Sequence, residues 1–184
     1  MPLSNSGLGN INISLPPNLA STVILEPIEG IAAGNVQAGI AELATQKLDN
    51  GSRFAAYQSA AHFVNPGDFT KVLYQVETFD NFSEFENSRF IPQKAGVYLF
   101  TASIHLTIDP PKTDWRIVAS LYKNGVETAR GVDLFSPSKY GVSFVVGFFP
   151  LAVGDFVEVH CYSEYSCNTL PGNAFSYFNG MQIA

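Results

Sequence analysis

From Arg53 onward, apolar and polar residues alternate with a period of two, in runs separated by Asn, Asp, Gly and Pro. The run Gly96 to Thr107 is the clearest example, because its apolar and polar residues fall on opposite faces of an extended chain. The apolar face has Tyr98, Phe100, Ala102, Ile104 and Leu106, and the other has Thr101, Ser103, His105 and Thr107. Short runs of this kind, with no helical segment between them, predict an all-β antiparallel sandwich or barrel.

Further strands are predicted on the same grounds. Trp115 to Tyr122 alternates in the same way, and the following Asn124-Gly125 suits the positive φ angles of a tight hairpin turn. A returning strand is therefore expected through Val126 and Thr128. The closing strands are expected at Asp155 to Glu164 and at Phe175 to Ile183.

The run Val142 to Phe149 is apolar on both faces, with Val142, Phe144, Val146 and Phe148 on one and Val145 and Phe149 on the other. In a monomeric sandwich the outer face of a strand is solvated, so a neighbouring subunit is expected to cover this one. We predict a subunit interface that contains Phe144, Val145, Val146, Phe148 and Phe149.

The chain before residue 50 is rich in Gly, Pro, Asn, Ser and Ala, and it contains no aromatic residue. This composition is typical of an extended arm and not of a core. We assign residues 1–52 to an N-terminal attachment arm and residues 53–184 to one head domain. Within the arm, Ile31 to Lys47 is compatible with a short helix, but Gly34 and Gly39 each weaken a helix by roughly 1 kcal/mol, so a linker stays equally compatible.

The amino-acid composition excludes some classes of partner. Charged residues make up 14% of the 184 residues, against about 25% in ordinary domains, so much of the surface is expected to face protein. The net charge is −6, and no stretch clusters Lys and Arg, so nucleic acid is not an expected partner. We expect neither a secretory signal nor insertion into a membrane, because no segment has the required apolar length.

No catalytic, cofactor-binding or metal motif surrounds the three histidines, His62, His105 and His160, so we expect them to be structural and the protein not to be an enzyme. The acidic segment with Asp80, Glu84 and Glu86 would bind calcium if its oxygens converged, and otherwise it is a solvated loop. Cys161 is interpreted as a small buried residue, and a local disulfide or metal pair with Cys167 is the alternative.

Several runs together resemble bacterial and bacteriophage members of the complement globular-head family, the tumour-necrosis-factor-like jelly rolls. They are FAAYQSAAHFV, FTKVLYQVETFD, SRFIPQKAGVYLF, LYKNG, PLAVGDFVEV and the final FNGMQIA, in the family's order. The resemblance covers roughly residues 53–184. It implies a jelly-roll β-sandwich of about ten strands that assembles as a homotrimer, with aromatic residues around the threefold axis. Some members of the family bind calcium.

The segment AGIAELATQ (Ala38 to Gln46) resembles one that recurs in bacteriophage tail fibres before a shaft or head domain. This resemblance implies a virion protein that docks on a tail or baseplate protein through residues 1–50. We therefore expect a structural and adhesive component of a tail fibre or spike. The alternative is a secreted or spore-surface bacterial trimer of the same fold, located on the extracellular bacterial surface.

A ligand site is expected in loops at the end of the head farthest from Arg53, since loops vary without disturbing a core. These loops are Asp109 to Asp114, Asp133 to Tyr140 and Glu164 to Asn173. The expected ligand is a host-surface glycan or protein. The candidate residues are Lys112, Asp114, Ser136, Lys139, Tyr140, Tyr165 and Asn168.

Overall fold

The computed structural model describes residues 35–48 and 51–183, and the chain divides into two compact units, Met1–Asn50 and Gly51–Ala184. In the first unit, helix α1 spans Val36–Leu48. The side-chain oxygen of Asn35 accepts a hydrogen bond of 2.9 Å from the backbone N–H of Ala38, which caps the first turn and explains why the helix begins there. A helix is therefore present, although residues 31–34 of the predicted range lie outside the described residues. Among the described residues, no helix is long and apolar enough to cross a membrane.

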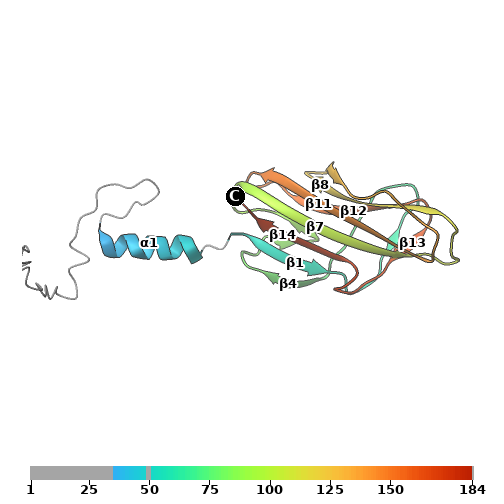
Figure 1. Cartoon of the computed structure of the whole chain (residues 1–184), viewed down its shortest axis with the longest axis horizontal. Coiled ribbons are helices and arrows are strands. Elements are labelled where there is room, and N and C mark those ends of the chain that lie inside the picture. Colours follow the sequence, from blue (N-terminus) through green and yellow to red (C-terminus); the bar gives the residue numbers. More distant parts are fainter. Residues whose placement is uncertain (1–34, 49–50, 184) are drawn as a thin grey trace, which may run out of the picture. The chain divides into compact units, whose positions relative to one another are not determined.

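The second unit, the head, is an antiparallel jelly-roll sandwich of two sheets with seven strands each (Figure 1). The first sheet contains β11 (Tyr140–Leu151), β7 (Gly96–Thr107), β14 (Tyr177–Gln182), β1 (Arg53–Tyr57), β4 (Val76–Asp80), β13 (Cys167–Thr169) and β2 (Phe63–Val64). The second contains β10 (Leu134–Ser136), β8 (Trp115–Lys123), β12 (Val157–Ser163), β6 (Arg89–Phe90), β5 (Phe85–Glu86), β3 (Thr70–Lys71) and β9 (Val126–Arg130). The head has more strands than the expected ten because several are pieces of two or three residues.

The core lies between the two sheets and contains the apolar side chains predicted for it, although Ser103 on the face predicted to be wetter is buried as well. The apolar face of β7 is buried along its length, and β8 buries Trp115, Ile117, Ala119 and Leu121. Aromatic rings fill the space between the sheets, with Phe54 stacked on Phe85 at 4.8 Å and on Phe90 at 5.0 Å. The predicted hairpin turn joins β8 to β9, and both of its residues have positive φ angles.

Strand β11 pairs with β7 along its whole length, and burial alternates strictly from residue to residue. Val145 and Phe149 point into the sandwich, where the ring of Phe149 lies 5.9 Å from that of Phe100. These two residues therefore belong to the core of a single head, which corrects the predicted interface. Phe144, Val146 and Phe148 point the other way and are exposed.

The head begins slightly before the predicted boundary at residue 53. Ser52 is buried, and its backbone oxygen accepts a hydrogen bond of 2.7 Å from the N–H of Gln182 on β14. Its hydroxyl donates to the carboxylate of Glu84. Ser52, which we assigned to the arm, is thus bonded into the head.

Candidate functional site

The outward face of the first sheet, here called the apolar face, is formed by two rows of side chains that cross neighbouring strands. One row runs Val146, Thr101, Asn179, Ala55 and Phe79, from β11 through β7, β14 and β1 to β4. The next runs Phe148, Leu99, Met181 and Arg53. Arg53 is the only charged residue in these two rows. Because successive residues of a strand point to opposite sides, none of these side chains helps to fill the core.

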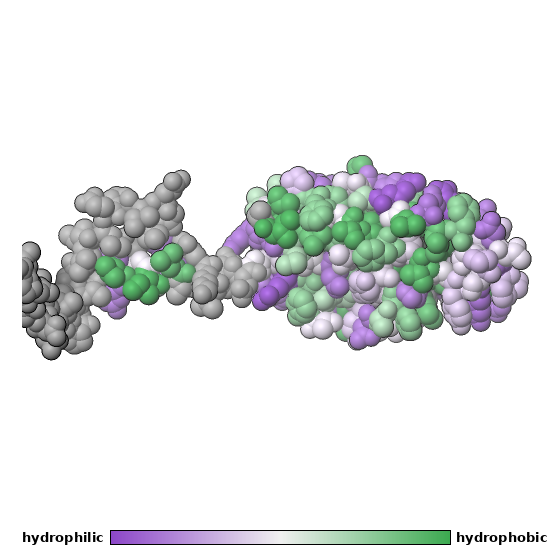
Figure 2. Space-filling model, in the orientation of Figure 1, coloured by the Kyte–Doolittle hydropathy of each residue, from purple (hydrophilic) through white to green (hydrophobic). Residues whose placement is uncertain are grey.

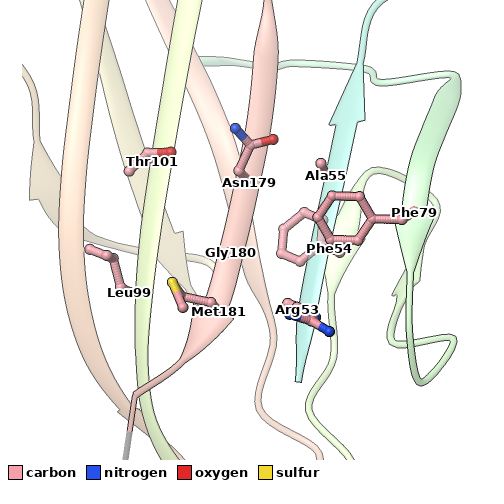
Figure 3. Close-up of a pocket in the computed structure, with 9 residues that line it drawn as sticks. All are labelled: Arg53, Phe54, Ala55, Phe79, Leu99, Thr101, Asn179, Gly180 and Met181. Atoms are coloured by element: carbon pink, nitrogen blue, oxygen red, sulfur yellow. The ribbon is translucent and has the colours of Figure 1, made fainter. Parts of the chain in front are cut away.

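A groove of about 360 Å³ lies in this face, across β7, β14, β1 and β4. Leu99, Met181 and Phe79 surround it, as Figure 3 shows. Ala55 contributes only a methyl group to its floor, and Gly180 lines it with backbone, since a side chain at Gly180 would point toward Phe54 and Phe100 in the core. The sequence pattern did not indicate this groove, since its residues come from four separate strands.

Beside the groove, β11 adds Phe144, Val146 and Phe148, all exposed in the single head. Phe148 has 61% of its surface exposed. Figure 2 shows hydrophobic residues gathered in a band along the head, over the region of β11 and β7. A contiguous apolar surface of large side chains is typical of a protein interaction site.

The three predicted ligand loops lie together at one end of the head, with β13, while β1 begins and β14 ends at the opposite end (Figure 1). The loops are also connected through side-chain contacts. The indole N–H of Trp115, at the start of β8, donates to the backbone oxygen of Ser138 at 2.9 Å, and the ammonium of Lys112 lies 4.9 Å from the ring centre of Tyr165. These contacts help to fix the arrangement of the loops.

A polar pocket of about 420 Å³, here called the distal pocket, opens at this end. It is lined by Phe63, Thr107, Asp109, Lys139, Ser166, Cys167 and Asn168. Two of the predicted ligand residues, Lys139 and Asn168, are among them.

The other predicted ligand residues lie outside this lining. Lys112 and Tyr165 contact each other, Asp114 and Tyr140 are exposed, and Ser136 is buried, where its hydroxyl donates to the backbone oxygen of Tyr140. The sequence analysis missed Phe63, Thr107 and Ser166, although the polar outward face predicted for Gly96 to Thr107 already included Thr107.

The carboxylates of Asp80 and Glu84 in the acidic segment accept hydrogen bonds from nearby backbone N–H groups. The carboxylate of Asp80 accepts hydrogen bonds from the N–H groups of Phe82 and Phe85. Glu84 is buried and accepts a bond of 2.6 Å from the N–H of Gln93. Within residues 35–48 and 51–183, no group of three His, Cys, Asp or Glu side chains is arranged to hold a metal ion. The oxygens that would have bound calcium do not converge.

Each histidine has its own structural surroundings. His62 lies 2.9 Å from the amide nitrogen of Gln58, His105 packs on Phe175, and His160 stacks on Tyr122 with 4.0 Å between ring centres. Burial lowers the pKa of all three imidazoles.

Cys161 and Cys167 are buried and free, and burial raises the pKa of both thiols. The interpretation of Cys161 as a small core residue is confirmed, and the local disulfide is not formed.

No protein-family model matches the chain, and a search of curated proteins finds no match to its sequence. Solved structures do match. The globular domain of zebrafish complement 1qA is 16% identical, with a TM-score of 0.51, over 72% of this chain and 98% of that one. Murine APRIL at pH 5.0 is also 16% identical, with a TM-score of 0.54, over 72% of this chain and 99% of that one. The head therefore has the jelly-roll fold of the complement 1q globular domain and of APRIL.

Proposed function

We propose that the head assembles into a homotrimer through its apolar face, and that the trimer is a structural and adhesive part of a virion appendage, a tail fibre or spike. The observation that carries this proposal is the contiguous apolar surface that Phe144, Val146 and Phe148 form beside the groove. Moving a phenylalanine as exposed as Phe148 out of water contributes roughly 1–2 kcal/mol, so covering this face is favourable.

The apolar face has two complementary parts in different places. Phe144 and Phe148 project from β11, which forms one edge of the sheet, whereas the groove extends to β4 at the other edge. A contact between the projection of one copy and the groove of the next joins unlike surfaces, and contacts of this type close into rings when the rotation allows. The resemblance of residues 53–184 to the complement globular-head family implies a ring of three.

Light scattering after gel filtration of the full chain tests this assembly. We expect three times the chain mass of 20.0 kDa at micromolar concentration. Phe148→Ser should shift the protein toward a monomer. Phe135→Ser is the matched control, because Phe135 is 57% exposed but belongs to β10 in the other sheet. A monomeric wild type, or equal dissociation by both substitutions, would contradict the proposed interface.

The virion role is supported by the tail-fibre-like segment Ala38 to Gln46, which lies within α1, and by the position of the loops at the end of the head opposite the start of β1. In this proposal, residues 1–50 dock on a tail or baseplate protein, and the loops meet a host-surface glycan or protein. The role is non-catalytic, which agrees with the separate structural surroundings of His62, His105 and His160.

Deletion of residues 1–50 tests the docking role. The shortened protein should keep the thermal midpoint of the head, since the head has its own core, yet it should no longer be incorporated into phage particles. The full chain, produced and added in the same way, is the control. A large fall in the thermal midpoint would show that the arm belongs to the core, and undiminished incorporation would place docking elsewhere.

A further inference from the structure

We infer that the distal pocket binds an uncharged saccharide unit of a host-surface glycan. This inference rests on the proposed adhesive function and names the ligand of that function. Four features of the pocket carry it: its construction from paired strands, its unpaired polar groups, its exposed aromatic ring and its balanced charge.

The distal pocket lies on the outward side of the first sheet, on a row of paired residues separate from the two rows that form the apolar face. Tyr140 of β11 lies opposite Thr107 of β7, Thr107 lies opposite Asn168 of β13, and Asn168 lies opposite Phe63 of β2. The loops add Asp109 and Lys139 beside this row. The N–H of Ile108 donates to the backbone oxygen of Lys139 at 3.0 Å, which holds the two loops together. A pocket placed on paired strands needs little ordering when a ligand binds.

The polar groups of the pocket are available to a ligand. Within the described ranges 35–48 and 51–183, the side chains of Thr107, Asp109, Ser166 and Asn168 form no hydrogen bond with another protein group. Other carboxylates differ, since Glu127 on β9 and Asp133 in the segment between β9 and β10 each bond an arginine at 2.6 Å. The polar side chains of the distal pocket are therefore available to bond a ligand.

The chemistry of these groups matches a sugar ring, which presents hydroxyls at its edge and C–H groups on its faces. The carboxylate of Asp109 accepts hydrogen bonds, the ammonium of Lys139 donates them, and the amide of Asn168 does both. Phe63 is 54% exposed and offers an apolar ring against which C–H groups can pack. A hydroxyl-rich ligand with an apolar face would satisfy both kinds of surface.

Charge and size argue against other ligand classes. One carboxylate and one ammonium balance, so the pocket has no net charge that would select an anionic ligand, and nucleic acid requires several cations along its backbone. A stable protein partner buries about 800 Å² on each side, around an apolar centre. The distal pocket of about 420 Å³ falls within the roughly 300–1,000 Å³ of small-molecule sites. Binding to one pocket is expected to be weak, and three copies on one particle-borne trimer would raise the avidity.

The full-length protein can be tested by saturation-transfer difference NMR with the methyl glycosides of glucose, galactose, mannose and N-acetylglucosamine as probes. At least one should give a signal at millimolar concentration. Asn168→Ala and Lys139→Gln should each weaken its binding about tenfold, as expected for loss of one hydrogen bond of about 1.4 kcal/mol. Asn65→Ala and Lys123→Gln are the matched controls, because neither residue lines the pocket or belongs to the three predicted ligand loops, and both variants should bind as the wild type does.

Absence of a signal with all four glycosides would overturn the inference, as would a signal that Asn168→Ala and Lys139→Gln leave unchanged. Light scattering on the same samples separates this outcome from failure of the assembly proposal. A trimer without saccharide binding refutes the pocket alone, and a monomer that binds saccharide refutes the trimer alone. If periodate oxidation of host-cell glycans leaves adsorption intact while Asn168→Ala abolishes it, the ligand is a protein and the saccharide assignment falls.

Discussion

Phe148 and Phe149 are adjacent on β11 but face opposite sides of the sheet, so replacing each by alanine separates folding from assembly. Phe149 is 4% exposed and packs on Phe100, and its truncation should leave a cavity that costs about 3–5 kcal/mol. Phe148 is 61% exposed, and its truncation should change the stability of an isolated head by less than about 0.5 kcal/mol. In a trimer, the same truncation should reduce the free energy of association by roughly 1–2 kcal/mol per subunit.

The assay is urea unfolding followed by the fluorescence of Trp115, the single tryptophan, which is buried in the core. Each variant is measured over a range of protein concentrations, because assembly stabilises the folded chain by mass action. Phe149→Ala should lower the free energy of unfolding at every concentration. Phe148→Ala should lower it only at concentrations where the wild type is assembled.

Two results would refute this reasoning. If Phe148→Ala destabilises the dilute protein as much as Phe149→Ala does, the outward direction of Phe148 is wrong. If Phe148→Ala has no effect at any concentration, the apolar face does not mediate assembly.

Two further substitutions test the head itself. Gly180→Ala should destabilise it by about 1–3 kcal/mol in urea unfolding, because the new methyl group would lie 2.5 Å from Phe54 and 2.7 Å from Phe100; unchanged stability would mean that these rings can move aside. The pKa of Asp155 is lowered to about 2, first by the hydrogen bond from the Asn124 side chain, so Asn124→Gly, which keeps the positive φ, should raise that pKa toward 3.8 in an NMR titration. A lowered carboxyl pKa stabilises the fold above the unfolded value of 3.8, and this stabilisation is lost as the pH falls toward 2. The variant should therefore lose less stability than the wild type between pH 3.8 and 2. An unchanged pKa of Asp155 would contradict the assigned cause.

The sequence by itself determined the strands of the head and several of their faces. Period two predicted β7 and β8 and the apolar side chains that they turn toward the core, because successive side chains of a strand point to opposite sides of its sheet. It did not predict that Ser103, Val118 and Ser120 on the opposite faces are buried too, since that depends on neighbouring segments. Asn124-Gly125 predicted the hairpin for an equally local reason, since few residue pairs accept two positive φ angles. The run of motifs from FAAYQSAAHFV to FNGMQIA indicated the jelly roll, which the structure confirms.

Only the tertiary structure decided which side of β11 faces the core. Both of its faces are apolar, and the choice depends on its pairing with β7, which turns Val145 and Phe149 toward Phe100 and leaves Phe144 and Phe148 outside. The distal pocket also depends on the tertiary structure. Its lining comes from Phe63, Thr107 and Asn168, which are far apart in sequence and become neighbours through the register of β2, β13 and β7. Local patterns specify the direction of a side chain within its own strand, whereas a site that spans strands exists only once the strands have paired.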